Sequence, residues 1–458
     1  MTEGVIWKNM LRFFFPILLG TFFQQLYNTA DAIIVGNFVG EEALAAVGGA
    51  SGQLINLLVG FFVGMAGGAT VIIAQFFGAG DREGVSLTVH TGIAFGLVGG
   101  LVLTVVGIAL SHQALLWMGT PEDVLPLSRT YMRIYFAGTV FNLIYNIGSG
   151  ILRAIGDSRR PLYFLITSCL TNILLDLLFV GVFGWGVMGV ALATILSQSV
   201  SAVLVILILM RSDDCYRLVP KQIRFHDPTL KRIIRLGIPA GLSSSMYAIS
   251  NTLIQATVNS FGTRTMAAWT AFGKLDGLFW MMLGAFGTTT ATFCGQNFGA
   301  RKFGRMRRTV RAGMLMSLIV GLAMSLFYQI TQDWALHLFL SEADTLAIAL
   351  RVLMIMTPFY FTFIPIEIFS GTCRSTGEAL YPMLCSASGI CGFRILWLLI
   401  VMPQFSNIEA LSWSYPASWA MTSIIYSIYY FRKKWLTRHL LPDENPKEVL
   451  AAYQKMEM

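Results

Sequence analysis

The chain has 458 residues, of which 55% are hydrophobic and only 12% are charged. Soluble domains carry roughly a quarter charged residues, so this composition excludes a soluble globular protein and indicates a membrane protein. The net charge of +8 could suggest a nucleic-acid partner, but the basic residues gather in alternate connections between apolar segments. That placement follows a rule of membrane topology instead, and we expect no nucleic acid to bind.

Twelve apolar windows follow one another along the chain, each able to cross a bilayer as a helix of about 20 residues. Short polar, glycine-bearing or proline-bearing connections separate them. The predicted spans are 13–38, 52–77, 88–110, 130–152, 161–183, 189–210, 233–261, 268–294, 312–330, 347–372, 380–402 and 409–431. The first window is too long for a signal peptide, so we expect it to be retained as a span. The prediction is an all-α, polytopic membrane protein.

Charged residues alternate between the two sides of the predicted spans. Basic residues precede the first span and follow the even-numbered spans, whereas acids dominate the odd-numbered connections, with Arg264 as the clear exception. Positive connections stay in the cytoplasm, so we expect a multi-pass protein of the cell's inner (cytoplasmic) membrane with both termini cytoplasmic. The basic clusters themselves fit a solvated rim beside anionic lipid. The six cysteines lie in spans or on this cytoplasmic side, and we expect free thiols.

The first span carries a single acid, Asp31, in the stretch YNTADAIIVG. An unpaired charge in hydrocarbon costs at least about 2.5 to 3.5 kcal/mol, so we expect the protein to use this carboxylate. Gln24, Asn28 and Asp31 are spaced i, i+4, i+7, which places them on one stripe of the helix. Pro16 lies near the beginning of the same span, where it removes a backbone hydrogen bond and permits a bend.

Further polar side chains follow in the fourth, fifth and sixth spans. The fifth contains NILLD, which places Asn172 and Asp176 one turn apart, while Asn146 lies in the fourth and Thr194 in the sixth. Two carboxylates, an amide and a hydroxyl facing each other would suit a hard monovalent cation or a shared proton. Close, desolvated carboxylates cannot readily both ionise, so one should hold a proton near neutral pH. The alternative is structural hydrogen bonding between helices at about 0.6 kcal/mol each, which suits the amides and Thr194 better than the acids.

The second half of the chain repeats the first. QFFGAGDREGVSLTVHTG begins at residue 75 and aligns with QNFGARKFGRMRRTVRAG from residue 296, an offset of 221, and RAIGDSRRP aligns with RSTGEALYP at the same offset. Each copy holds six spans, an even number, so both should enter from the cytoplasm and be related by an axis along the membrane normal.

This duplication predicts two lobes. We place the lobes at 1–210 and 233–440, with a cytoplasmic linker at 211–232 and a cytoplasmic tail at 441–458. Two such lobes can rock and expose a central cleft to each side in turn, which makes transport the leading function. Glycines 60, 64 and 68, and again 92, 96 and 100, recur every four residues, so we expect them to pack spans closely.

The polar site of the first half is not repeated in the second. At the repeat offset, Asp176 becomes Trp397, and Asn146 becomes the acid Glu367. Glu367 and Arg394 could form a structural ion pair or belong to a substrate cleft. The predicted cleft residues are Gln24, Tyr27, Asn28, Asn251, Gln255, Asp276, Glu367 and Arg394. Aromatic side chains such as those at 269, 280 and 415 could stack on an organic cation or simply pack against lipid.

The ordered stretches NTADAIIVG, LAAVG, AQFFGAGD, LRAIGDSRRP and NILLD, with the duplicated FGA loops, resemble the multidrug and toxic compound extrusion (MATE) family. The likeness covers nearly the whole chain and is greater to the prokaryotic branch similar to the DNA-damage-inducible F type. It implies twelve helices in two six-helix lobes that expel organic cations in exchange for protons or sodium. It also implies a first helix that bends near Pro16. The residues that match the family's coupling site, where Na⁺ could bind, are Asp31, Asn172, Asp176 and Thr194, with Asn146 nearby.

One departure from the family pattern concerns the seventh span. Sodium-coupled relatives often carry a glutamate there, whereas SSSMYAISNTLIQATV has none, which favours coupling through the first lobe. We therefore expect a monomeric secondary antiporter in the lipid bilayer, with small organic cations as substrates and no cofactor beyond H⁺ or Na⁺. The alternatives are a lipid-linked oligosaccharide flippase, a single-solute metabolite exporter or a passive channel. We expect no enzyme, because the five histidines are scattered and no HExxH or GxSxG motif occurs.

Overall fold

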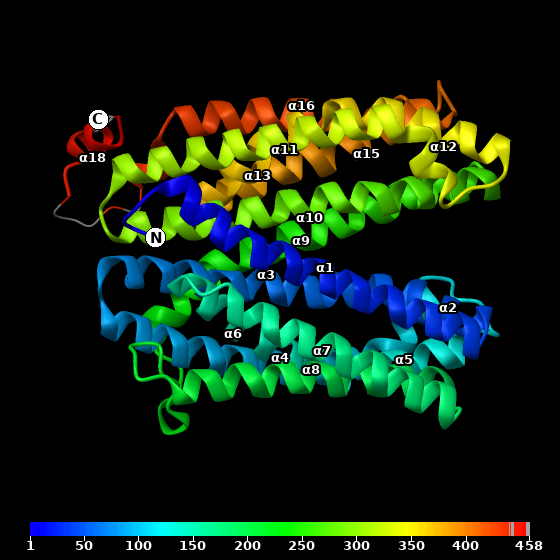
Figure 1. The fold of residues 1–458 in the computed structure, drawn as a ribbon, viewed down its shortest axis with the longest axis horizontal. Helices are drawn as coiled ribbons and strands as arrows, with labels where there is room; N and C mark the ends of the chain where they lie inside the picture. Colours follow the sequence, from blue (N-terminus) through cyan, green and yellow to red (C-terminus); the bar gives the residue numbers. More distant parts are fainter. Residues whose placement is uncertain (439, 441–443, 455–458) are drawn as a thin grey trace. The chain divides into compact units, whose positions relative to one another are not determined.

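The computed structural model describes residues 1–438, 440 and 444–454. Within these residues the chain consists of helices and their connections and contains no strand (Figure 1). The chain forms two compact units. We call Phe15–Ser245 the first unit, and Met1–Phe14 together with Met246–Met458 the second unit.

The helices of the first unit alternate long spans with short connecting turns. They are α1 (Ile6–Phe38) from Phe15 onward, α2 (Glu41–Gly48), α3 (Ala50–Ala79), α4 (Arg82–Trp117), α5 (Leu125–Ala137), α6 (Thr139–Ile155), α7 (Arg159–Asp176), the π-helical η1 (Leu177–Val182), α8 (Gly186–Arg211), the short η2 (Pro220–Gln222) and α9 (Asp227–Ser260) as far as Ser245.

The second unit contains the beginning of α1 and the chain from Met246 onward. Its helices are the remainder of α9, α10 (Thr263–Gly299), α11 (Phe303–His337), α12 (Ala343–Met356), η3 (Thr357–Phe359), α13 (Tyr360–Ser375), α14 (Leu380–Ser386), the π-helical η4 (Ala387–Gly392), α15 (Phe393–Ile400), α16 (Ile408–Phe431), α17 (Lys434–Thr437) and α18 (Pro446–Gln454). The predicted tail, 441–458, includes α18, while 441–443 and 455–458 lie outside the described residues.

Every predicted span coincides with helix. Seven helical segments among the described residues are long and apolar enough to cross a membrane by length and composition alone. They are Glu41–Ala79, Arg82–Trp117, Arg159–Val182, Gly186–Arg211, Phe303–His337, Ala343–Ser375 and Leu380–Ile400. The predicted window 130–152 is divided at Gly138 between α5 and α6. The all-α class predicted from the sequence is confirmed.

In the first unit α6 packs against α3, α4 and α8, and α7 packs against α8. Two apolar clusters fill the spaces between these helices, one around Val89, Ile147 and Val205 and one around Phe136 and Val190. The packing of these side chains stabilises the helical bundle, because every pair of apolar atoms in contact adds dispersion energy. These clusters fix the spacing of α5, α7 and α8, on which the polar site described below depends.

Glycines bring α3 close to the first half of α9. A Cβ atom at Gly64 would lie 2.8 Å from the Cα atom of Gly241, and one at Gly237 would lie 2.6 Å from the Met65 carbonyl oxygen. Gly68 is equally close to backbone, at 2.7 Å from the Ile233 carbonyl oxygen. The prediction of close packing is therefore confirmed for Gly64 and Gly68. It is wrong for Gly60, which would have no described atom of another segment within 4 Å.

In the second unit α10 packs against α11, α12 and α13, and α13 packs against α16. Aromatic rings form much of its interior. Phe279 and Tyr360 stack with ring centroids 3.9 Å apart, and Phe369 stacks on Tyr430 at 4.1 Å. The beginning of α1 joins this interior, because Phe14 stacks on Phe286 with centroids 4.0 Å apart.

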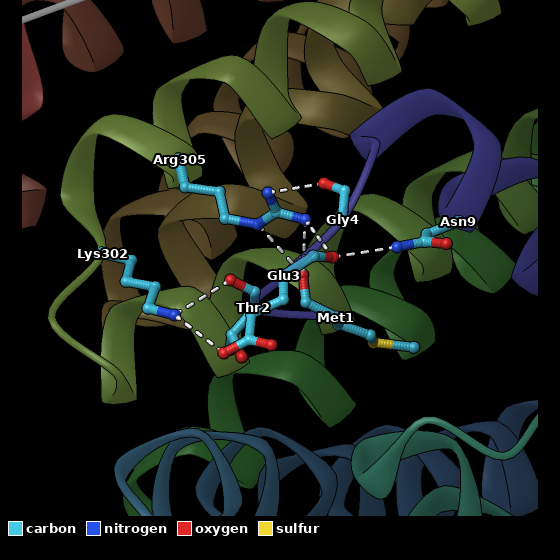
Figure 2. Close-up of polar contacts among 7 residues, drawn as sticks. All are labelled: Met1, Thr2, Glu3, Gly4, Asn9, Lys302 and Arg305. Carbon is cyan, nitrogen blue, oxygen red and sulfur yellow. Dashed lines mark hydrogen bonds and ion pairs between the residues drawn. The ribbon is translucent and has the colours of Figure 1, made fainter. Parts of the chain in front are cut away.

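Two basic side chains at the beginning of α11 hold the amino terminus (Figure 2). The Arg305 guanidinium donates to the backbone carbonyl oxygens of Met1, Glu3 and Gly4 at 2.7 to 3.2 Å. Lys302 Nζ donates to the Thr2 carbonyl oxygen at 3.1 Å. These contacts attach the segment before α1 to the second unit.

Two helices are divided between the compact units. α1 belongs to the second unit up to Phe14 and to the first unit from Phe15, while α9 belongs to the first unit up to Ser245 and to the second from Met246. The predicted lobes, 1–210 and 233–440, place all of α1 in one lobe and the part of α9 from residue 233 onward in the other. The beginning of α1 therefore belongs to the second unit, and the beginning of α9 belongs to the first unit. The division in α1 falls beside Pro16.

Candidate functional site

Four polar side chains predicted from the sequence come together inside the first unit. Asp31 extends from α1, Asn172 and Asp176 from α7, and Thr194 from α8. Asp31 lies within direct side-chain interaction range of the other three. Asp31 is 7% exposed and Asp176 is fully buried, so neither carboxyl group faces lipid or water. The one-turn spacing of Asn172 and Asp176 places both on the same face of α7.

The oxygens of this cluster are not saturated by hydrogen bonds. Among the described residues, Asp31 Oδ1, both carboxylate oxygens of Asp176 and both polar side-chain atoms of Asn172 are buried without a hydrogen-bond partner. Leaving a buried polar atom unpaired costs about 1 to 3 kcal/mol, and more if it is charged. The oxygens among these atoms therefore keep lone pairs free for a proton or a cation.

The acids also have no basic partner. None of the ion pairs formed by the described residues involves Asp31 or Asp176. The hydroxyl of Thr194 donates to the Val190 carbonyl oxygen at 2.9 Å, which leaves its lone pairs free to accept. Carboxylate, amide and hydroxyl oxygens suit Na⁺ or a shared proton. In the described part of the chain, no three or more His, Cys, Asp or Glu side chains are grouped so that they could hold a metal ion.

Three tyrosines lie near the cluster, and a glutamine lies beside one of them. Tyr27 lies within hydrogen-bonding range of Thr194 and acts electrostatically on Asp31, Tyr131 acts electrostatically on both acids, and Tyr135 lies within hydrogen-bonding range of Gln198 and acts electrostatically on Asp31. The sequence reasoning placed Tyr27 in the substrate cleft and did not single out the others. The available signal was spacing, because Tyr131 and Tyr135 are four residues apart in the fourth predicted span and Gln198 follows Thr194 by one turn.

The helix that carries Asn172 and Asp176 changes its form directly after the second acid. α7 ends at Asp176 and continues as the π-helical turn η1. π-helical turns are uncommon and occur often at functional sites, because they widen the helix and redirect neighbouring side chains. The irregularity therefore begins directly after one of the two acids of the cluster.

Other predicted residues of the first unit lie outside this cluster. Asn146 donates from Nδ2 to the carbonyl oxygen and Oδ1 of Asn142, one turn back on α6, and none of its hydrogen bonds with described residues reaches Asp31. Gln24 and Asn28 share the helical stripe of Asp31 and are exposed.

The second unit holds a different polar arrangement. Asp276 on α10 accepts hydrogen bonds from Trp280 Nε1 and from the hydroxyl of Tyr360, each at 2.7 Å. Arg394 on α15 donates from Nε to Ser418 Oγ at 3.2 Å, and its guanidinium lies 3.9 Å from the centre of the Tyr415 ring. These contacts link α10 to α13 and α15 to α16.

The sequence left a structural ion pair between Glu367 and Arg394 as one possibility. No ion pair joins them among the described residues, so that interpretation is wrong. An alignment of the two repeats shows which positions correspond, but it does not give the distance between two side chains. It therefore could not decide whether Glu367 and Arg394 form an ion pair. Of the remaining predicted cleft residues, Asn251 is exposed and Gln255 donates to Asn259 Oδ1 at 2.9 Å.

Comparison with known proteins now identifies the family. The MatE family model matches the chain twice, over residues 16–178 and 239–400. The chain belongs to the MATE family. The two matches begin at Pro16 and Pro239, 223 residues apart, so the duplication predicted from the sequence is confirmed as two copies of one family unit.

Curated relatives of this MATE protein carry names that refer to drug resistance. It is 31% identical to the probable multidrug resistance protein YoeA of Bacillus subtilis over 446 residues, which cover 94% of this chain and 96% of the relative. It is 23% identical to the multidrug export protein MepA of Staphylococcus aureus, with 90% of each chain covered. The family is one of multidrug efflux transporters, and its members are transporters rather than enzymes.

Solved structures show the same fold. A MATE structure described as the straight conformation superposes with a TM-score of 0.88 at 22% identity, covering 95% of this chain and 98% of that one. One described as the bent conformation gives 0.87 at 22% identity, covering 95% and 97%. This MATE protein is therefore a multi-pass helical membrane protein with the twelve-span transporter fold predicted from its sequence.

Proposed function

We propose that this MATE protein is a secondary active antiporter that exports organic, mostly cationic compounds in exchange for H⁺ or Na⁺. The observation that carries the proposal is the cluster of Asp31, Asn172, Asp176 and Thr194, in which Asp31 Oδ1, Asn172 Oδ1 and both carboxylate oxygens of Asp176 are buried without a hydrogen-bond partner among the described residues. Such a cluster can exchange its negative charge for a bound cation. The relatives named as multidrug export proteins support the choice of substrate class.

The coupling step follows from where these residues sit. A cation entering from outside neutralises the Asp31 and Asp176 pair, which removes the repulsion between the two carboxylates. Asp31 lies on α1, and the same helix contains Pro16 beside the division between the two compact units. Pro16 lacks the amide hydrogen of an ordinary helical residue, so α1 can bend there when its acid changes charge. We infer that this bend moves the two lobes, and that the substrate then leaves.

The membrane potential supplies part of the driving force. Each elementary charge that moves inward contributes about 2.3 kcal/mol per 100 mV. A net inward movement of one charge per transport cycle therefore supports roughly a fortyfold concentration ratio of exported substrate at that potential. The basic cytoplasmic connections support an orientation in the cytoplasmic membrane with both termini inside, and we propose that a single chain is the transporting unit.

The remaining sequence predictions belong to this proposal. The lobes at 1–210 and 233–440 are the bodies that would move, and the motif order supports the branch similar to the DNA-damage-inducible F type. Asn146 is retained as a neighbour of the coupling site. The proposed cleft residues are Gln24, Tyr27, Asn28, Asn251, Gln255, Asp276, Glu367 and Arg394.

The experiment that tests the function is efflux of a fluorescent organic cation from proteoliposomes, with sodium and pH gradients imposed separately. We expect export with one gradient, and loss of at least about tenfold in rate in Asp31→Asn and in Asp176→Asn, because an amide cannot exchange a negative charge for an ion. Asp333→Asn is the matched control, since it removes an exposed acid of α11. Gradient-driven export that is unchanged in both variants would remove the acids from the mechanism.

A further inference from the structure

Two buried oxygens outside the acid cluster also lack a hydrogen-bond partner. They are Oε1 of Gln198 on α8 and Oγ of Ser149 on α6, and neither has a partner among the described residues. Gln198 follows Thr194 of the cluster by one helical turn. Tyr145 lies near Ser149, but the two side chains do not meet the geometry of a hydrogen bond. Both oxygens therefore keep lone pairs free for a proton or a cation.

The helices that carry these oxygens, α6 and α8, run side by side in the same direction. A Cβ atom at Gly138 would lie 3.5 Å from the Ile195 Cα atom, and one at Gly148 would lie 3.3 Å from the Val205 Cβ atom. Both pairs are 57 residues apart, so each residue of α6 lies level with the residue 57 positions later on α8. Thr194 is thus level with the beginning of α6, and the rest of α6 leads away from the acid cluster.

Polar side chains continue from the cluster along both helices. The stripe on α6 has the spacing i, i+4, i+7, i+11, and with 3.6 residues per turn it faces the same side of the helix pair as the polar positions of α8. We call these residues the polar column: Gln198 and Ser201 on α8, and Asn142, Asn146, Ser149 and Arg153 on α6. In the shared register, consecutive members from Thr194 onward are at most four residues apart, which is about 6 Å along the axis.

Arg153 lies where the column reaches the end of α6. Its side chain is half-buried and forms no ion pair or hydrogen bond with a described residue. It acts electrostatically on Tyr145, whose hydroxyl donates to the Pro161 carbonyl oxygen near the beginning of α7. The proposed orientation places this end of α6 in the cytoplasm. A guanidinium stays charged at any physiological pH, so a fixed positive charge ends the column.

We propose that the polar column is the route by which the coupling cation leaves the acid cluster for the cytoplasm, and that Arg153 is a valve at its end. Amide and hydroxyl oxygens can receive H⁺ or Na⁺ in place of water. The guanidinium repels cations of the cytoplasm and keeps them out of the column. Because no acid holds it, its long side chain can swing toward the cytoplasm when a cation arrives from the cluster. This inference rests on the proposed antiport and adds a path for the ion.

The test of the valve measures cation movement without substrate. Proteoliposomes that contain the full chain receive an inward gradient of Na⁺ or of pH, and uptake of ²²Na⁺ or the signal of an internal pH dye is followed. We expect little flux in the wild type and at least about tenfold more in Arg153→Gln, because the repelling charge is gone. Arg153→Lys keeps the charge and should stay at the wild-type level.

Arg374→Gln is the matched control for the valve. Arg374 occupies the same position of the repeat, in the last turn of α13, and it is also half-buried without an ion pair among the described residues. Both substitutions therefore remove a charge from the end of a helix, where it stabilises the helix dipole. The polar column belongs to the first unit, so Arg374→Gln should not raise the cation flux.

The test of the route uses Ser149→Ala, which removes a free oxygen from the middle of the column. Gradient-driven export of a fluorescent organic cation should slow by at least about threefold. Exchange of labelled for unlabelled substrate at equal concentrations needs no net release of the coupling cation, so it should keep its rate and show that the variant is folded. Ser111→Ala changes a buried serine of α4, outside the column, and should leave both rates unchanged.

The outcomes separate this inference from the antiport itself. A cation flux in Arg153→Gln no greater than in the wild type, or an equal rise in Arg153→Gln and Arg153→Lys, would overturn the valve. Export at the wild-type rate by Ser149→Ala would overturn the route, and it would do so even if Arg153→Gln did not fold. The antiport would stand in each case, because the wild type still exports with one gradient. A wild type that exports with neither gradient would overturn both.

Discussion

The crossing of α3 and the first half of α9 predicts a large effect for a very small substitution, Gly237→Ala. The new Cβ atom would lie 2.6 Å from the Met65 carbonyl oxygen, 2.9 Å from its Cα atom and 3.1 Å from its carbonyl carbon. All three atoms are backbone, so no side-chain rotation can relieve the clash. Ordinary van der Waals contact begins at 3.4 Å, which means that the two helices must separate by about 0.8 Å at this point.

The expected cost is that of overpacking, about 1 to 3 kcal/mol, because a separation at one residue also loosens the contacts of Gly64, Gly68 and Gly241. Alanine gains about 1 kcal/mol of helix propensity over glycine, and this gain would mask part of the cost. The matched control is Gly60→Ala, which has the same gain and no described atom of another segment within 4 Å of the new methyl group. The difference between the two variants isolates the clash.

The assay is thermal unfolding of the two purified variants in the same detergent, followed by tryptophan fluorescence. Gly60→Ala should unfold at or above the wild-type temperature, and Gly237→Ala should unfold clearly below it. Hydrogen exchange should rise in the part of α9 that belongs to the first unit, since this segment is displaced. Equal unfolding temperatures for the two variants would show that the close backbone approach of α3 and α9 does not occur, and the reasoning would fail.

Two further predictions concern the amino terminus and the connection that follows α8. Arg305→Gln removes the hydrogen bonds to the carbonyl oxygens of Met1, Glu3 and Gly4 and should speed proteolysis of the amino terminus, whereas Arg308→Gln changes an exposed neighbour and should not. Equal rates of proteolysis in the two variants would contradict the contacts of Figure 2. Burial, and then the Asp214 carboxylate, raise the pKa of the Cys215 thiol. The rate of maleimide labelling of this half-buried thiol should therefore rise about tenfold per pH unit near neutrality. Labelling should also be faster in Asp214→Asn, because this substitution removes the negative charge that raises the pKa of the thiol. A labelling rate that does not change with pH, or that is no faster in Asp214→Asn than in the wild type, would refute this prediction. The other five free cysteines are buried and should react slowly.

The polar cluster could be predicted because buried charge is rare and helical spacing is regular. Asp31 stands alone in an apolar window, and the one-turn interval between Asn172 and Asp176 is enough to assign both to a common helix face. Tyr131 and Tyr135 follow the same spacing, but tyrosines are common at membrane interfaces and in cores, so their presence beside Asp31 could not be inferred from sequence alone.

Contacts between distant helices were harder to anticipate. The glycine pattern of α3 is visible in the sequence, yet only the structure shows that Gly64 and Gly68 meet α9 while Gly60 does not. The same limit explains the Glu367 and Arg394 prediction, since two opposite charges on different helices can pair only if the packing brings them within reach. Periodicity determines which face of a helix is polar, but not which neighbour that face meets.

The division of α1 between the units has a consequence for biosynthesis. Phe286, Lys302 and Arg305, which contact the segment Met1–Phe14, are synthesised more than 250 residues after that segment, since Phe286 follows Phe14 by 272 residues. Until these residues are synthesised, the amino-terminal segment cannot form its contacts with them. The second unit is therefore completed by a segment that is synthesised long before the rest of that unit, and a fragment that begins at Met246 would lack part of the interior of its own unit.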